Sequence, residues 1–94
     1  MKYAIVTTQV YRKSLRRLSR SGSFARSELD TVVELLGKGD ILPLKYRDHA
    51  LTGNLRDFRE CHIRPDLLLI YTKDEGILVL VLVNIGSHAT LLKK

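Results

Sequence analysis

"FRECHIRPDLLLIYTKDEGILVLVLVN", residues 58–84, is the stretch most informative about the fold because it holds three short apolar segments separated by two turn signals. Segments 58–63, 67–72 and 77–84 are rich in aliphatic and aromatic residues, as β-strands are. The turns "RPD" and "KDEG" are tight, and tight turns make neighbouring strands antiparallel. The run "ILVLVLV" has no polar alternation, so we expect a central strand covered on both faces, one of them by helices.

The residues before this stretch predict a short strand at 3–7 and then two helices. Thr7 or Thr8 can cap the first helix, whose apolar positions follow the spacing of one buried stripe: Tyr11, Leu15 and Leu18. After "SGS", where Ser23 can cap again, the same spacing returns at Leu29, Val32, Val33 and Leu36. Gly37 supplies a stop signal for the second helix.

The predicted fold class is therefore α+β, with an N-terminal strand and a two-helix hairpin packed on an antiparallel β-sheet. The chain of 94 residues fits one domain, which we place at 1–94. The longest apolar run, 77–83, is far shorter than the ~20 residues that span a bilayer. No secretory leader is visible, and a single cysteine fits a reducing compartment, so we expect a cytoplasmic protein.

The positive charge is concentrated in one segment. The chain has sixteen Lys and Arg residues against ten Asp and Glu, which gives a net charge of +6. Segment 11–26 contains no acid and six of the cations: Arg12, Lys13, Arg16, Arg17, Arg20 and Arg26. Such a face suits a polyanion, either a nucleic acid or an acidic protein segment, and an ordinary solvated helix face is the alternative.

Three histidines lie outside the strongest apolar runs, and antiparallel strand order can bring them together: His49, His62 and His88. Imidazoles serve as base and acid near neutral pH, and RNA supplies its own 2′-OH nucleophile, so no metal is obligatory. A zinc site is the weaker alternative because the spacings of 13 and 26 residues lack the close pairs that zinc sites show. Cys61 would face away from His62 and fill the core.

"DHALTGN" at 48–54, "ECHIRPD" at 60–66 and "GSH" at 86–88 together resemble the YafQ branch of the RelE-like toxins of bacterial toxin–antitoxin modules. The resemblance covers about residues 46–92. It implies a RelE-like microbial ribonuclease fold and a ribosome-dependent endoribonuclease that cleaves mRNA, uses no cofactor, and is neutralised by an acidic, DNA-binding antitoxin. The residues that match the active site of the family are His49, His62, Asp66 and His88.

The resemblance also suggests roles. His49 or His62 would take the 2′-OH proton, Asp66 would orient a neighbouring imidazole, and His88 would protonate the leaving oxygen. RNA contacts are expected from Arg56, Arg59, Arg64 and Asn84. Contacts to the ribosome or the antitoxin are expected from Arg12, Lys13, Arg16, Arg17 and Arg20.

The sequence departs from the family pattern at three positions. Asn84 stands where arginine is common, Leu67 where tryptophan is common, and Leu92 where phenylalanine is common. An amide cannot replace the charge of a bidentate phosphate clamp. A weakened or inactive relative that binds its antitoxin or a nucleic acid is therefore the alternative function, and a gyrase poison on the same fold is a third that would not need these histidines.

Overall fold

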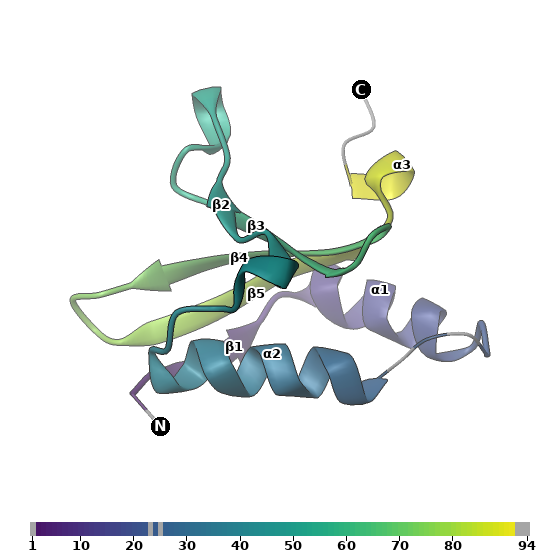
Figure 1. Ribbon diagram of the computed structural model, residues 1–94, viewed down its shortest axis with the longest axis horizontal. Coiled ribbons are helices and arrows are strands. Elements are labelled where there is room, and N and C mark those ends of the chain that lie inside the picture. Colours follow the sequence, from purple (N-terminus) through teal and green to yellow (C-terminus); the bar gives the residue numbers. More distant parts are fainter. Residues whose placement is uncertain (1, 23, 25, 92–94) are drawn as a thin grey trace.

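A computed structural model of the chain describes residues 2–22, 24 and 26–91, and its strands form one five-stranded sheet. The strand order is β1-β5-β4-β3-β2 (Figure 1). The bounds are β1 Ala4–Thr7, β2 His49–Ala50, β3 Arg59–Arg64, β4 Leu67–Asp74 and β5 Val79–Gly86. Strands β2 to β5 pair antiparallel, as the tight turns between β3, β4 and β5 predict.

The sheet is mixed, not purely antiparallel, because β1 joins it at the β5 edge and runs parallel to β5. The register pairs Ala4 with Val79 and Thr7 with Leu82. The chain leaves β1 through two helices and three other strands before it returns as β5. A connection of that length can re-enter the sheet in the same direction, whereas turn signals report only on neighbours in sequence.

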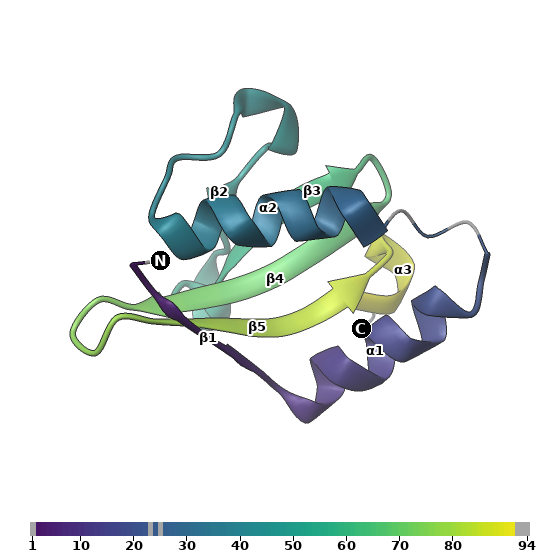
Figure 2. The same ribbon diagram turned by 90° about the horizontal axis from the view of Figure 1, so that it is seen from below.

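The two long helices, α1 (Gln9–Ser19) and α2 (Arg26–Lys38), cover the same face of the sheet (Figures 1 and 2). They form an open pair, with strands of the sheet visible between them in Figure 2. Three single-turn elements complete the fold: η1 Leu44–Tyr46, η2 Gly53–Leu55 and α3 His88–Leu91. In the described part of the chain, no helix has the length and apolar character needed to cross a membrane.

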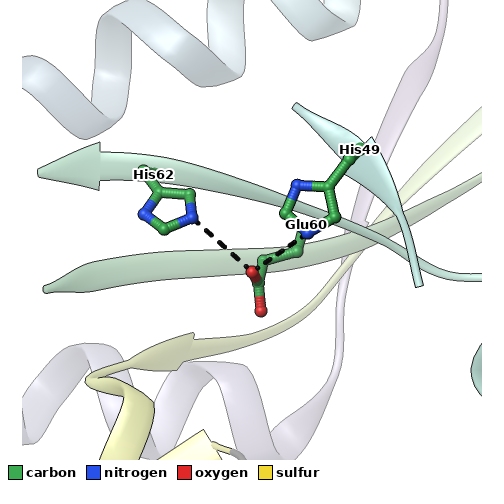
Figure 3. Close-up of side chains that lie close together, drawn as sticks. All are labelled: His49, Glu60 and His62. Carbon is green, nitrogen blue, oxygen red and sulfur yellow. Dashed lines mark ion pairs between the residues drawn. The ribbon is translucent and has the colours of Figure 1, made fainter. Parts of the chain in front are cut away.

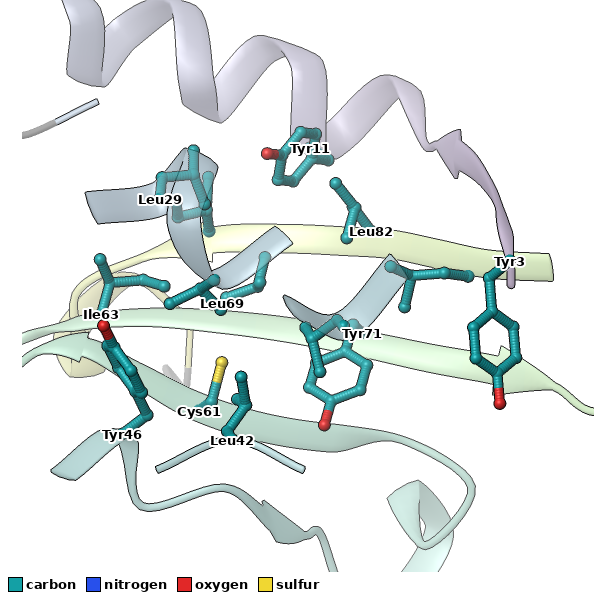
Figure 4. Packing of buried hydrophobic residues seen from close by; sticks show 14 residues of the cluster. Tyr3, Tyr11, Leu29, Leu42, Tyr46, Cys61, Ile63, Leu69, Tyr71 and Leu82 are labelled. Carbon is teal, nitrogen blue, oxygen red and sulfur yellow. The ribbon is translucent and has the colours of Figure 1, made fainter. Parts of the chain in front are cut away.

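The core lies between these helices and the sheet (Figure 4). The predicted helical stripes point into it: Tyr11, Leu29, Val32 and Leu36 are buried, and Leu15, Leu18 and Val33 pack against them. The sheet contributes Cys61, Ile63, Leu69, Tyr71, Leu80, Leu82 and Ile85. Burying side chains of this size stabilises the fold by about 1.5–3 kcal/mol each, before the loss of chain entropy is counted.

The helix ends follow local backbone chemistry. Thr8 is the N-cap of α1, because its Oγ1 accepts a hydrogen bond from the Tyr11 N–H at 2.9 Å. The prediction that Gly37 ends α2 is wrong. Gly37 is buried inside the helix, and its carbonyl accepts hydrogen bonds from the Lys2 and Tyr3 N–H groups. The stop is Gly39, whose φ of +85° reaches the left-handed region that α2 needs to end. The predicted Ser23 cap lies outside the described residues.

The last strand differs from its prediction at both ends and on one face. It begins at Val79, because Ile77 and Leu78 form the exposed hairpin turn and Leu78 has φ of +56°. The helices bury the face that carries Leu80 and Leu82, while Val81 on the other face is half-buried. The run "ILVLVLV" is therefore covered fully on one face only, and apolar residues on the other face do not require a second layer.

Candidate active site

Strand β3 separates the core from the candidate site. Cys61 is completely buried among the helices, and burial raises the pKa of its thiol to about 12, so it is a core residue as predicted. Glu60 and His62, one position to either side, point to the opposite face of the sheet because successive strand residues alternate. The site therefore lies on the face that the long helices leave free (Figure 1).

Cross-strand pairing brings the three histidines onto this face. His49, which the sequence placed in a loop, lies in β2 directly opposite Glu60. His62 pairs with Leu68 of β4, and Leu68 pairs with Gly86 at the end of β5. The chain then turns, and His88 begins α3. Three segments far apart in the sequence thus meet because neighbouring strands place directly opposed side chains on one face.

The three imidazoles form a row with His62 in the middle. The centroid of the His62 ring lies 6.2 Å from that of His49 and 5.6 Å from that of His88. Glu60 lies between the rings of His49 and His62 (Figure 3). Its Oε1 is 3.4 Å from His49 Nε2 and 3.7 Å from His62 Nε2. The side chains of Glu60 and His62 are 5% and 9% exposed, whereas that of His49 is 50% exposed.

The hydrogen bonds around His49 fix its tautomer. His49 Nδ1 lies 2.7 Å from the Arg47 carbonyl, which can only accept, so Nδ1 carries a hydrogen. Nε2 is then the nitrogen that gains or loses a proton, and it faces the Glu60 carboxylate. Glu60 Oε2 and His62 Nδ1 are buried with no hydrogen-bond partner among the described residues. Buried polar groups of this kind mark places where a ligand can bind.

At the other end of the row, Asp66 holds His88. Asp66 Oδ1 accepts from both the backbone N–H and Nδ1 of His88, each at 3.1 Å. The backbone hydrogen bond, followed by the ring hydrogen bond, holds the pKa of the Asp66 carboxyl below its usual range. The carboxylate is therefore ionised at neutral pH, and its contact with His88 is lost only as pH falls through that lowered pKa. His88 Nε2 has no hydrogen-bond partner among the described residues, so it can face a substrate.

One group at this site has the donor set of a metal centre. His49, Glu60 and His62 each offer one ligand atom, and these atoms lie within 4.8 Å of one another. Two imidazoles and one carboxylate suit zinc or a related transition metal. Glu60 is a member of this group that the spacings of the histidines alone do not predict. The signal was the i, i+2 pair Glu60 and His62, which share one face of a strand.

The predicted arginines lie in different places. The Arg59 side chain is on the helix side of β3, where its guanidinium bonds Asp48 at 3.2 and 3.3 Å. Arg56 and Arg59 both line a cavity of about 500 Å³, and none of the three histidines is part of its wall. Arg64 is the last residue of β3, two positions after His62, and is paired with Glu28 at 2.6 Å. The Asn84 Oδ1 accepts from the Ser14 hydroxyl and the Ile85 N–H, so it ties α1 to β5.

The five predicted contacts for the ribosome or the antitoxin are all exposed, four of them on α1 and one at its C-cap: Arg12, Lys13, Arg16, Arg17 and, at the cap, Arg20. The Arg12 guanidinium bonds the carbonyl and hydroxyl oxygens of Thr7. This helix lies on the face of the sheet opposite to the histidines (Figure 1). Leu67, at the start of β4, packs against the core, and Leu92 lies outside the described residues.

Comparison with known proteins identifies the family. The model of a bacterial toxin of type II toxin–antitoxin systems, YafQ, matches residues 3–93. The chain belongs to the YafQ toxin family. The α+β fold with its mixed sheet is that of YafQ toxins. A metal-bound toxin from Helicobacter pylori is 42% identical, with a TM-score of 0.88 over 95% of this chain and 98% of that one.

Two further matches are to YafQ of Escherichia coli. The toxin in the DinJ–YafQ complex is 27% identical, with a TM-score of 0.83 over 95% of this chain and 97% of that one. The mRNA interferase toxin YafQ of strain K12 is 38% identical over 50 residues. That alignment covers 53% of this chain and 52% of the relative, so the chain matches about half the length of the curated YafQ protein.

Proposed function

We propose that this YafQ-family chain is a ribosome-dependent endoribonuclease that cleaves mRNA and so inhibits translation, without a cofactor. The observation that carries the proposal is the row of three imidazoles with a buried carboxylate at one end and a carboxylate-oriented imidazole at the other. Such a row supplies a proton acceptor and a proton donor on either side of one phosphate.

His49 is the proposed base. Its Nδ1–H is engaged by the Arg47 carbonyl, so Nε2 is the atom that accepts the proton of the ribose 2′-OH. The Glu60 carboxylate, 3.4 Å away, stabilises the positive charge that the ring gains. His62 Nε2 lies 3.7 Å from the same carboxylate. Because the His62 side chain is only 9% exposed, it is less accessible to the 2′-OH than His49 is, so its proposed role is to position Glu60.

His88 is the proposed acid. Asp66 holds its Nδ1–H, which leaves Nε2 to deliver a proton. The 2′-oxygen attacks phosphorus as its proton moves to His49, the bond from phosphorus to the 5′-oxygen breaks, and that oxygen takes the proton from His88. The products are a 2′,3′-cyclic phosphate and a 5′-hydroxyl, and the base and the acid have exchanged protonation states.

The proposed partners are the ribosome, its mRNA and an acidic, DNA-binding antitoxin, with no membrane, in the cytoplasm. The antitoxin is proposed because a related toxin was solved in a complex named DinJ–YafQ. The basic face of α1 offers the charge that either an antitoxin segment or ribosomal RNA would contact.

The assignment of His88 as the acid is tested with two mRNAs on translating ribosomes. His88→Ala should slow cleavage of ordinary mRNA by about 10²- to 10⁴-fold, the usual contribution of a general acid. Replacing the bridging 5′-oxygen of the cleaved linkage by sulfur makes a leaving group that needs no proton. His88→Ala should cut that mRNA at nearly the wild-type rate, whereas His49→Ala should remain slow on both.

The outcomes separate the two candidate functions. If the wild-type protein does not cut either mRNA, the chain is a binding module, the alternative that the Asn84 side chain favours because its oxygen is already used within the fold. If His88→Ala stays slow on the sulfur-bridged mRNA, His88 is not the acid. Circular dichroism of each variant checks that the fold is intact.

A further inference from the structure

A small cavity adjoins the row of histidines at the end of β3. Its volume is about 170 Å³, and His62 is part of its wall. The charged side chains that line it are Glu28, Lys45, Arg47 and Arg64. The cavity therefore holds three cations against one carboxylate, directly beside a residue of the candidate active site, and none of the proposed proton transfers uses it.

Two of these cations are available to a ligand. Arg64 is already paired with Glu28 at 2.6 Å. The Arg47 guanidinium makes no hydrogen bond or ion pair with any residue that the structure describes, and Lys45 contacts only the ring of Tyr46, with Nζ 5.1 Å from its centroid. After the internal pair is set aside, the cavity keeps two positive charges for an anion.

A buried ring nitrogen of His62, which is part of the cavity wall, also lacks a hydrogen-bond partner in the described structure. The His62 side chain is only 9% exposed, and its Nδ1 is buried without a hydrogen-bond partner in the described structure. Figure 3 shows that this nitrogen is on the side of the ring turned away from Glu60. A buried ring nitrogen without a hydrogen-bond partner is costly, and an anion oxygen in the cavity would accept a hydrogen bond from Nδ1 in the ring forms that carry a hydrogen there.

We propose that this cavity binds a second phosphate of the RNA, the one immediately 5′ of the nucleotide whose 2′-OH attacks, with Arg47 and Lys45 as its clamps. The proposal rests on the proposed ribonuclease function. It adds a specificity element to that function, because a site for a neighbouring phosphate fixes the register of the RNA chain across the histidines.

The order of the histidines gives the direction. His88 protonates the leaving 5′-oxygen, so the 3′ part of the RNA lies at the His88 end of the row. The nucleotide that supplies the 2′-OH lies at the His49 end, and its own 5′-phosphate continues away from His88. Two residues that line the cavity are close to the proposed base: the His62 ring centroid lies 6.2 Å from that of His49, and the Arg47 carbonyl accepts a hydrogen bond from His49 Nδ1–H.

The test uses ribosomes programmed with three mRNAs: one unmodified, one with an uncharged methylphosphonate at the 5′ neighbouring linkage, and one with it at the 3′ neighbouring linkage. For the wild-type protein, the 5′ replacement should slow cleavage about tenfold, as expected for loss of a charge-assisted contact. In Arg47→Gln or Lys45→Gln, whose clamp is already weakened, the same replacement should slow cleavage much less.

Three points make this result specific. Arg47→Gln leaves the Arg47 carbonyl in place, so the hydrogen bond to His49 is kept. Lys38→Gln removes one exposed cation from the last turn of α2 and should retain the tenfold sensitivity. The 3′ replacement should affect all four proteins alike, since no clamp residue is proposed for that phosphate.

Equal slowing by the 5′ replacement in the wild type, Arg47→Gln and Lys45→Gln would overturn the phosphate site, while cleavage of the unmodified mRNA would leave the ribonuclease proposal standing. A loss of sensitivity to the 3′ replacement in Arg47→Gln would also overturn it, because the clamp would then be on the other side. A wild-type protein that fails to cut unmodified mRNA would overturn both proposals.

Discussion

At the scale of single residues, Glu60 shows how position changes the meaning of an ordinary side chain. A glutamate beside a buried cysteine on a strand would be unremarkable if its carboxylate reached solvent. Here the carboxylate is 5% exposed, touches two imidazoles through Oε1 and leaves Oε2 without a partner in the described structure. An arrangement that costs stability is expected where it serves binding or catalysis.

Glu60→Gln is therefore expected to separate activity from stability. Cleavage of mRNA should fall by at least about 100-fold, because the amide no longer stabilises a positive charge on His49. The free energy of unfolding should stay the same or rise, because a neutral amide is cheaper to bury than a carboxylate with an unpaired oxygen. Cleavage assays and urea unfolding measure the two quantities.

Glu34→Gln is the matched control, since Glu34 is exposed on α2. It should leave both quantities unchanged. A Glu60→Gln protein with full activity would exclude the carboxylate from the reaction, and one with much lower stability would show that the ion pairs to the histidines contribute more than the unpaired oxygen costs.

At the scale of elements, the end of α2 is set by a glycine, Gly39, that the apolar spacing of the helix does not single out. The apolar stripe of α2 finishes at Leu36, and this pattern predicts that the first glycine after it, Gly37, ends the helix. The Gly39 N–H donates to the Leu36 carbonyl and the Asp40 N–H to the Leu35 carbonyl, which closes the helix two residues later. A φ of +85° makes Gly39 the position that needs glycine.

Gly39→Ala should lower the free energy of unfolding by about 1–2 kcal/mol, the cost of the left-handed conformation for an ordinary residue. An added Cβ would also come within 2.8 Å of Lys2 Cδ, which can move. Gly39→Asn should lose less, because asparagine tolerates this conformation better. Urea unfolding of both variants decides, and an unchanged Gly39→Ala protein would contradict the assigned helix end.

At the scale of the whole molecule, chemistry and charge are on opposite sides of the sheet. The histidines lie on the face without the long helices, and the arginines of α1 lie beyond the other face (Figure 1). Asn84 links the two by accepting a hydrogen bond from Ser14 of α1. The proposed mRNA site on one face therefore leaves the other face available for the proposed contact with ribosomal RNA or an antitoxin.

The double variant Arg16→Gln, Arg17→Gln tests which polyanion this helix contacts. If this helix lies on ribosomal RNA, log affinity for the ribosome falls as log salt rises, because phosphate contacts release counterions. The steepness of that fall should be smaller by about 1 to 2 in the double variant. The charge-preserving pair Arg16→Lys, Arg17→Lys should keep the slope. An unchanged slope in the glutamine variant would assign these cations to the antitoxin or to solvent.

The local elements were predictable because their causes are local. The strands β3 and β4 fall within two residues of their predicted bounds, and Thr8 caps α1 as one of the two residues considered. Apolar spacing, turn residues and a capping hydroxyl act over a few positions, so the sequence reports them directly. The position of Gly39 was missed because helical backbone geometry, not apolar spacing, decides the last turn.

Local patterns in the sequence predict the α+β class, the main helices and strands, the core stripes and a likeness to YafQ toxins carried by three short motifs. Contacts between distant segments instead make β1 run parallel to β5, turn Arg59 to Asp48 on the helix side, and set Glu60 between two imidazoles. These outcomes depend on strand register and on burial, which arise from contacts between residues far apart in the chain. The site is made by those contacts, so its members could be suspected from the sequence while their geometry could not.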